Sequence, residues 1–303
     1  MVSVSLGAHK YGKAENRVVR IYRDTPRHEI VDLNVTSQLT GAALAPSYFE
    51  GDNGPVVATD TQKNTIFAFA KKHGIRSPEE FLLTLADHFV SGFEWIEGGL
   101  WQAEQYEWER ILVDGQPHDH SFVRSGRGTR LAAVRAVDGE THVTGGVKDL
   151  VVLKSTGSEF AGFPRDTYTT LVETDDRVMA TSVTGRWRFI PEAVAAGIDY
   201  NGLYAEVSAV LLSTFATVHS LALQQTLWEM GRAAIEARPE IAEVRFAMPN
   251  KHHFVYDLSP FGLENPNEVF YAADRPYGLI EGTITRDGVA PAPAAWADLP
   301  TFV

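Results

Sequence analysis

Three short stretches of the sequence contain side chains that can move protons or bind a polar small molecule. In the first, PVVATDTQKN, an apolar run ends in Thr59 and Asp60. In the second, MPNKHHF, Pro249 interrupts a strand-like pattern and is followed by Asn250 and His252. Proline is poorly tolerated in a paired central strand, so we expect a bulge or a break there, which would redirect the neighbouring side chains. An amide beside an imidazole suits recognition of a polar ligand and proton transfer near neutral pH.

The third stretch runs from Leu150 to Arg177, LVVLKSTGSEFAGFPRDTYTTLVETDDR. It begins as an apolar strand, ends that strand at Lys154, and continues with Phe160 and, at its end, Arg177. The guanidinium group is a planar fork of donors that fits a flat anionic ring, and a phenyl ring offers a face for stacking. This stretch alone is weak evidence for a binding site.

Each of these stretches also has a purely structural explanation. Thr59 and Asp60 could cap a helix, since their side chains accept hydrogen bonds from the first free amides, and the residues alone favour this explanation. His252 could be a solvated residue at the end of a strand, an explanation as good as the catalytic one. Arg177 could form a surface ion pair with Asp175 or Asp176.

A metal site is the other chemistry that the residue types suggest, at His118 and His120 in the segment HDH. Two histidines at strand spacing can chelate a metal, but the sequence offers no third ligand and contains no cysteine, so a hairpin turn is the favoured interpretation. The lack of cysteine also excludes disulfides and thiolate nucleophiles. No glycine-rich phosphate loop follows a strand, so a common nucleotide cofactor is not supported.

The overall composition narrows the classes of function further. The chain has 303 residues, 44% of them hydrophobic, and 27 basic against 39 acidic residues, a net charge of −12. Binding to a nucleic-acid backbone requires a basic surface, so a nucleic acid is not the expected partner of this acidic chain. An anionic small molecule would need a local positive site. No signal peptide is evident, and the apolar stretch 204–223 is interrupted by polar residues, so we predict a cytoplasmic protein without a membrane span.

Hydrophobic periodicity predicts the elements that must position these side chains. In the first half, alternating segments around 19–21 and 31–35 predict a hairpin. Ser77, Pro78 and Glu80 predict the start of a helix, with Ser77 as its N-cap. Alternation in QYEWE, a turn at DGQPHDH and a strand over about 121–137 predict a second hairpin.

The second half repeats this order. Strands are predicted in 147–156 and 178–189, then one broken helix or two helices from about Tyr200 to Pro239, then strands in 244–258 and 279–286. We therefore expect an α+β fold made by internal duplication, with antiparallel sheets covered by helices and domains at 1–140 and 141–303. Segments 41–55 and 259–276 are predicted loops, and the tail from Asp287 an extended arm that frays or docks on a neighbour.

Five motifs together resemble the urate oxidase (uricase) family. They are YGK at Tyr11–Lys13, VVATDTQKN, the stretch Leu150–Arg177, HSLALQQTLW and MPNKHHF, in the family's order and across almost the whole chain. The resemblance implies two tandem tunnelling-fold (T-fold) repeats per chain. It also implies a homotetramer around a β-barrel tunnel, with active sites at the subunit interfaces.

The resemblance also implies roles for particular residues. Lys13, Thr59 and His252 would form a proton relay, and Asn250 with Thr59 would hold dioxygen or water. Thr59 and Asp60 would reach the site across the subunit interface. The substrate contacts would come from Arg177 and Gln224 at the purine edge, Phe160 on the ring face, and the backbone amides of Thr59 and Leu223, the last at a position where the family usually has valine.

The implied reaction is oxidation of urate by O2 and water to 5-hydroxyisourate and hydrogen peroxide, with no metal and no organic cofactor. A cyclohydrolase of the same fold is an alternative, but such enzymes need a zinc site, which the absence of cysteine disfavours. A purine-binding protein without catalytic activity is the alternative from another class. It would bind urate without consuming oxygen.

Overall fold

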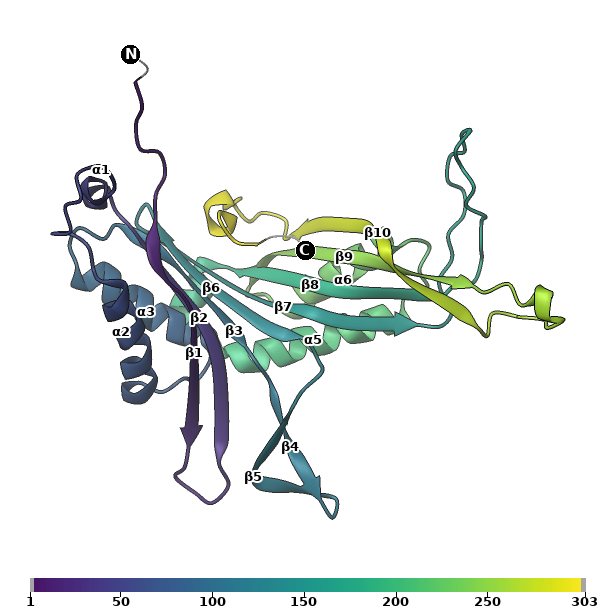
Figure 1. The fold of residues 1–303 in the computed structure, drawn as a ribbon, viewed down its shortest axis with the longest axis horizontal. Coiled ribbons are helices and arrows are strands. Elements are labelled where there is room, and N and C mark those ends of the chain that lie inside the picture. The colour runs from purple at the N-terminus through teal and green to yellow at the C-terminus, as the bar shows by residue number, and fades with distance from the viewer. Residues whose placement is uncertain (1–2, 301–303) are drawn as a thin grey trace. The chain divides into compact units, whose positions relative to one another are not determined.

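The computed structural model describes residues 3–300, as strands and helices that form two compact units (Figure 1). The first unit holds the described residues up to Gly146, together with Arg188–Tyr200 and Ala292–Ala297. The second unit holds Val147–Trp187, Asn201–Pro291 and the described residues from Asp298 onward. The fold is mixed α+β, with antiparallel strand pairing and helices packed on the strands.

In the first unit the strands lie in the order β1-β2-β3-β6-β7. They are β1 (Tyr11–Tyr22), β2 (Glu29–Thr40), β3 (Gly98–Gln105), β6 (Thr129–Val137) and β7 (Glu140–Lys154), the last of which continues into the second unit. The predicted first hairpin is confirmed as the antiparallel pair of β1 and β2. Along β2, Leu33, Val35 and Leu39 are fully buried, as expected for a strand with one face on the core.

Two helices pack on these strands, where the sequence predicted one with clarity. The first, α2 (Thr59–Lys72), packs on β1, and α3 (Pro78–Gly92) packs on β3 and β6 (Figure 1). The predicted start of α3 is confirmed, since the Ser77 hydroxyl accepts a hydrogen bond from the Glu80 amide at 3.2 Å. One face of α3 is buried in the core and consists of Leu82, Leu85, Ala86 and Phe89.

Two predictions in the first half were wrong in detail. The loop 41–55 contains a 3-10 helix, η1 (Ala42–Leu44), and a short helix, α1 (Pro46–Phe49). The single strand predicted over 121–137 is two strands, β5 (Gln116–Arg124) and β6. Strand β5 pairs with β4 (Trp108–Val113) in a separate two-stranded sheet and does not continue into β6. Polar residues and Gly126 and Gly128 separate β5 from β6, and their disruption of the alternation was overlooked.

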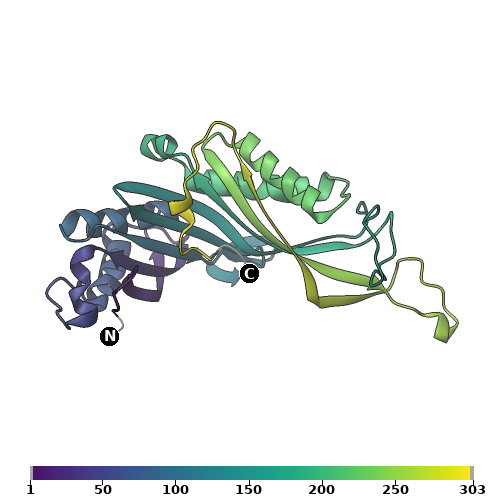
Figure 2. The same cartoon turned by 90° about the horizontal axis from the view of Figure 1, so that it is seen from above.

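The second unit repeats the order of strands, helices and strands. Its strand order is β7-β8-β9-β10, with β8 (Met179–Phe189) entered from β7. The long apolar region forms two helices, α5 (Tyr200–Thr217) and α6 (Leu223–Ala237), which confirms one of the two alternatives. Helix α6 packs on β9 (Ile241–Val255) and β10 (Phe270–Thr285), and both helices lie on the same side of these strands (Figure 2).

The C-terminal segments differ from their predictions. Strand β10 begins within the predicted loop 259–276, which also holds a 3-10 helix, η2 (Ser259–Phe261). The tail is neither frayed nor an extended arm over its described length. It forms η3 (Pro293–Trp296), and Trp296 is buried, because this segment packs into the first unit of its own chain. A short helix, α4 (Pro191–Ala196), belongs to the same unit.

Helices that could cross a bilayer are not found within residues 3–300, where none combines the necessary length and apolar character.

Candidate active site

Lys13 is held at an irregular point of β1. The pairing of β1 with β2 shifts its register between Lys13 and Asn16, and Glu15 adopts a left-handed φ of 54° there. Asn16 is buried, and its Nδ2 donates to the carbonyl oxygens of Lys13 at 3.0 Å and Val35 at 2.8 Å. A bulge re-aims side chains, and here a buried amide fixes the bulge, so the backbone of Lys13 is rigidly positioned.

Strand β1 is tied to the start of α2 close to Lys13. The Tyr11 hydroxyl donates to the Val57 carbonyl at 3.0 Å, and Tyr11 and Lys13 lie on the same face of the strand, two residues apart. Asp60 binds Lys63 and Asn64 within the first turn of α2. Its pKa is lowered mainly by the hydrogen bond and charge of Lys63, and further by the positive charge of Lys13. Lys13 and Asp60 are therefore electrostatic neighbours.

Thr59 is the first residue of α2 and not its cap. The N-cap is Ala58, which has no side chain able to accept a hydrogen bond, so the capping explanation for Thr59 and Asp60 was wrong. The first amides of a helix have no partner within the helix. Without a side-chain cap, the amides at Thr59 and Asp60 remain available to an acceptor from outside, and the helix dipole makes this end electropositive.

In the second unit, Phe160 belongs to a segment that is hydrogen-bonded on both sides. On one side Phe160 forms a two-bond bridge with Thr174, at 2.8 and 3.1 Å between amides and carbonyls. On the other side Ser158 and Ser220 form a parallel bridge, in which the Glu159 amide donates to the Ser220 carbonyl at 2.8 Å. These bridges join the segment to the approach to Arg177 and to the connection between α5 and α6.

Arg177 is half-buried and lies against this segment. Its guanidinium carbon is 5.3 Å from the centroid of the Phe160 ring, and its Nε donates to the Ser158 hydroxyl at 3.1 Å. The surface ion pair considered from the sequence was wrong: Arg177 has no carboxylate partner within residues 3–300, and Asp176 accepts instead from the Thr156 hydroxyl at 2.8 Å. Burial lowers the pKa of Arg177, which still leaves it protonated at neutral pH.

Leu223 and Gln224 occupy the first positions of α6. The side chain of Leu223 is buried and that of Gln224 is exposed. As at α2, the N-cap is an alanine, Ala222, without a side-chain hydrogen bond, so the first amides of α6 are also available to an external acceptor. The Gln224 amide group forms no hydrogen bond with another described residue, whereas Gln225 is used internally, accepting from the Leu221 amide at 2.8 Å.

Asn250 and His252 lie two residues apart on β9 and share a face of that strand. The predicted bulge is confirmed, although the extra residues are in the partner strand β10, between Ala273 and Gly278, and Pro249 itself stays paired with Leu279. The pKa of His252 is lowered, first by burial and then by the positive charge of Arg177 and by His253. His252 is thus a neutral imidazole within reach of the field of Arg177.

The predicted residues therefore fall into two groups, each contained in one unit. The first-unit group is Lys13, Thr59 and Asp60, in which the structure brings Lys13 and Asp60 together. In the other group the structure brings Arg177 together with Phe160 and His252. This second-unit group consists of Phe160, Arg177, Leu223, Gln224, Asn250 and His252.

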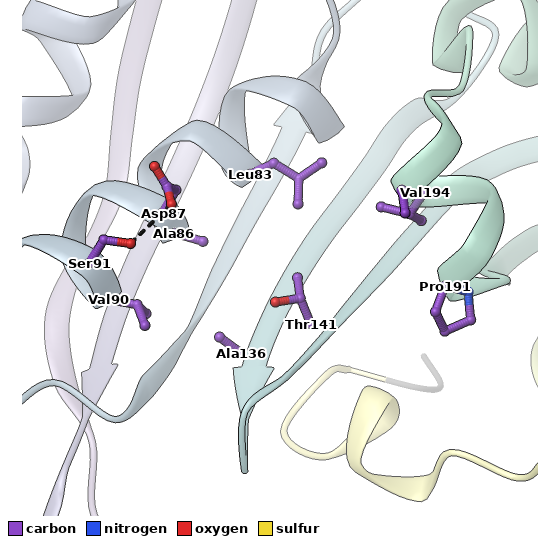
Figure 3. A pocket seen from close by; sticks show the side chains of 10 residues that line it. Leu83, Ala86, Asp87, Val90, Ser91, Ala136, Thr141, Pro191 and Val194 are labelled. Atoms are coloured by element: carbon purple, nitrogen blue, oxygen red, sulfur yellow. Dashed lines mark hydrogen bonds between the residues drawn. The ribbon is translucent and has the colours of Figure 1, made fainter.

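Among the described residues, neither a metal centre nor the groove on the first unit is a better candidate site than these groups. The described residues contain no cluster of three or more histidine or carboxylate side chains that could hold a metal ion. His118 and His120 lie within β5, with ring centroids 4.5 Å apart, and not in the predicted turn. A groove of about 480 Å³ between α3 and α4 is lined largely by apolar side chains, and its one carboxylate, Asp87, is bound by Ser91 at 3.0 Å (Figure 3).

Sequence reasoning overlooked the residues that hold the predicted ones in place. Asn16 and Ser158 are the clearest examples, since one fixes the bulge at Lys13 and the other binds Nε of Arg177. A polar residue in an apolar strand pattern was the available signal for Asn16. Nothing in the sequence pairs Ser158 with a residue so far along the chain.

Comparison with known proteins identifies the family. A sequence model of the uricase family matches residues 9–135 and 143–281. A uricase from Arthrobacter globiformis is 54% identical over 299 residues, which cover 99% of this chain and 96% of the relative, and a uricase from Dictyostelium discoideum is 36% identical over 280 residues, which cover 92% and 96%.

Solved structures agree with the sequence relatives. The crystal structure of the Arthrobacter globiformis uricase superposes with a TM-score of 0.92 at 54% identity, covering 98% of this chain and 100% of that one. A uricase from Bacillus fastidious superposes with a TM-score of 0.80 at 25% identity, covering 93% and 94%. Because the family model matches most of its residues and the relatives span nearly its full length, this chain belongs to the uricase family.

Proposed function

We propose that the protein is a urate oxidase, which oxidises urate with O2 and water to 5-hydroxyisourate and hydrogen peroxide as a step of purine breakdown. The observation that carries this proposal is Arg177, a half-buried guanidinium without a carboxylate partner among the described residues, stacked against Phe160. In a chain with a net charge of −12, a cation left unpaired at that position suits an anionic ligand. The phenyl ring beside it suits a flat one.

The remaining members of the second-unit group extend this recognition. The Gln224 amide group and the free amides at the start of α6 can bind the oxygen and nitrogen atoms on the purine edge. His252 is held neutral by burial and by Arg177, so it is able to accept a proton at neutral pH. Asn250 lies on the same strand face and would hold dioxygen or water near the ring.

The first-unit group would supply the proton chemistry. The unprotonated amine form of Lys13, with Thr59 and with His252 of the second-unit group, would take the proton from the urate anion, and the electron-rich ring would then reduce O2. Two electrons pass from urate to O2, and water adds to the oxidised ring at C5. The ring gains a hydroxyl group from that water, and O2 leaves as hydrogen peroxide, so that urate, O2 and H2O are consumed in equal amounts.

The proposal includes an assembly. We place the two units as tandem T-fold repeats, with domains at 1–140 and 141–303, and four chains around a β-barrel tunnel, with the first-unit group of one subunit facing the second-unit group of another. Support comes from the family model, which matches the chain in two segments, and from the similar element order of the two units. A cytoplasmic location remains a prediction.

The test is oxygen uptake by the purified protein on addition of urate, followed together with loss of the urate ultraviolet absorption and with and without a strong metal chelator. Matched uptake and loss that ignore the chelator are expected. Saturable urate binding without uptake would replace the proposal with a non-catalytic purine-binding function. Uptake abolished by the chelator would contradict the cofactor-free reaction and direct attention to His118 and His120.

A further inference from the structure

The way in which Arg177 is held points to a residue to which no role has been assigned. An arginine that must bind an anion needs an internal partner to fix its orientation, and that partner must not neutralise its charge. A carboxylate would fix the guanidinium and also compete with the ligand. A neutral hydroxyl that accepts from Nε fixes the plane of the group and leaves both Nη atoms for a bidentate contact.

Ser158 meets this requirement. Its hydroxyl accepts from Nε of Arg177 at 3.1 Å, and its carbonyl oxygen accepts from the Arg177 amide at 2.9 Å. The Nη atoms of Arg177 donate to no described residue. No described carboxylate forms an ion pair with Arg177. Both the backbone and the side chain of Arg177 are thus attached to one serine.

Ser158 is itself fixed by its surroundings. It is fully buried, and it bridges to Ser220, which is also fully buried. The Ser220 hydroxyl accepts from the Thr226 hydroxyl at 2.7 Å and donates to the Ala222 carbonyl at 3.0 Å, next to the start of α6. The backbone bridge to Ser220 thus holds Ser158 in place, whereas the hydroxyl pair of Ser220 and Thr226 lies at the start of α6 and does not contact Arg177.

We propose that Ser158 is a positioning residue that sets the affinity of the second-unit group for its anionic ring, by orienting the guanidinium of Arg177 without reducing its charge. The proposal rests on the proposed function for the identity of the ligand. The chemistry it requires is broader: a flat anion with two adjacent acceptor atoms. Ser158 affects binding more than the chemical step, because Arg177 would contact the ring edge and not the reacting proton.

The test measures the binding of xanthine, a flat purine without the 8-oxo group of urate, together with the kinetics of urate oxidation. Ser158→Ala is expected to raise the dissociation constant for xanthine and the KM for urate roughly three- to tenfold, while kcat stays within about twofold, since one orienting hydrogen bond is lost. Ser158→Cys keeps the volume of the side chain and weakens the acceptor, so it is expected to raise both constants by a smaller factor. It replaces the alanine variant if that variant does not fold.

Two comparisons separate orientation of Arg177 from a general structural effect. Thr226→Val removes a hydroxyl that is equally buried and donates to Ser220, but does not touch Arg177 or the Ser158 side chain; its xanthine affinity is expected to stay within about twofold of the wild type. In an Arg177→Met background, which lacks Nε, Ser158→Ala is expected to change the remaining xanthine affinity less than about twofold.

An equal loss of affinity in the Arg177→Met background would overturn the proposal, because Ser158 would then act without Arg177. Unchanged affinity in both Ser158→Ala and Ser158→Cys would overturn it as well. Failure of the proposed function is distinguishable from these results: a wild-type protein that binds xanthine but takes up no oxygen with urate disproves urate oxidation, while the affinity comparisons on Ser158 still decide its role.

Discussion

Lys13 is the residue to which the proposed chemistry assigns proton removal. It lies at a bulge whose backbone is fixed by a buried asparagine, and its charge reaches Asp60 at the start of α2. Lys13→Met removes the base and keeps the length of the side chain, so turnover with urate should fall roughly 10²- to 10⁴-fold, the usual contribution of a positioned base.

Binding of xanthine to the same variant should change far less than turnover. Lys71→Met, on the exposed C-terminal end of α2, is the matched control and should retain wild-type turnover. Steady-state kinetics measure the turnover of each variant, and titration with xanthine measures its binding. A Lys13→Met enzyme that turns over urate at the wild-type rate would remove Lys13 from the mechanism.

The lowered pKa of His252 predicts how stability and activity change with pH. Burial, Arg177 and His253 lower its pKa below the ordinary value of 6.5, so the folded protein favours the neutral ring. As the pH falls below 6.5, the unfolded chain takes up this proton before the folded chain does, and the stability that neutral His252 contributes is lost as the pH passes down through the lowered pKa. Activity that depends on neutral His252 should fall in the same window.

We therefore expect the acid limb of kcat/KM in the wild type to lie below pH 6.5 and to be absent from the residual activity of His252→Gln. The unfolding free energy of that variant should also vary less with pH in this window than that of the wild type. His73→Gln, at the end of α2, is the control for a change of imidazole elsewhere. An identical acid limb in His252→Gln would assign the titration to another group.

At the scale of elements, most predicted site residues lie at an irregularity of a strand or at the first turn of a helix, whereas Phe160 and Arg177 lie in the segment between β7 and β8. Lys13 precedes a bulge in β1, and the irregularity of β10 faces β9 between Asn250 and His252. Thr59 and Gln224 lie in the first turns of α2 and α6, both of which begin after an alanine that cannot cap. Regular elements supply rigidity, and their interruptions direct the side chains and free amides.

The bulge in β1 can be tested through Asn16. Asn16→Ala removes two hydrogen bonds of a buried side chain, to the carbonyl groups of Lys13 and Val35, and leaves those acceptors without the Asn16 donor. The free energy of unfolding, measured by denaturant titration, should fall by about 1–3 kcal/mol. In the folded variant kcat should fall more than KM rises, because Lys13 loses its position and the second-unit group is untouched. A rise in KM with an unchanged kcat would contradict the link between Asn16 and the position of Lys13.

The outcome for these elements shows what sequence patterns can and cannot determine. Periodicity correctly indicated the β1–β2 hairpin, the start of α3 at Ser77 and the bulge near Pro249, because local propensity and burial agree there. It overlooked the division of 121–137 into β5 and β6, although Gly126 and Gly128 mark it. It also overlooked the burial of Trp296, which depends on packing with a distant part of the chain. The partners of Arg177 are non-local in the same way, and no local pattern could show that Ser158 rather than Asp175 or Asp176 binds it.

At the scale of the whole molecule, the two site groups belong to two compact units of one chain. The first-unit group contains the proposed base, and the second-unit group contains the anion-binding arginine and the stacking ring. Neither group has all the parts of the proposed reaction. The complete reaction therefore requires that a first-unit group and a second-unit group meet, and we propose that they do so across a subunit interface.

The most direct test of this claim is the activity of mixed assemblies of Lys13→Met and Arg177→Met, each of which should be nearly inactive alone. If sites are shared between paired subunits, half of the pairs formed at equal expression are mixed, and one of the two sites in each mixed pair has both groups intact. Co-expressed protein should then recover about one quarter of the wild-type rate of oxygen uptake with urate. Activity no higher than that of the separate variants, in assemblies shown to contain both chains, would contradict the shared site.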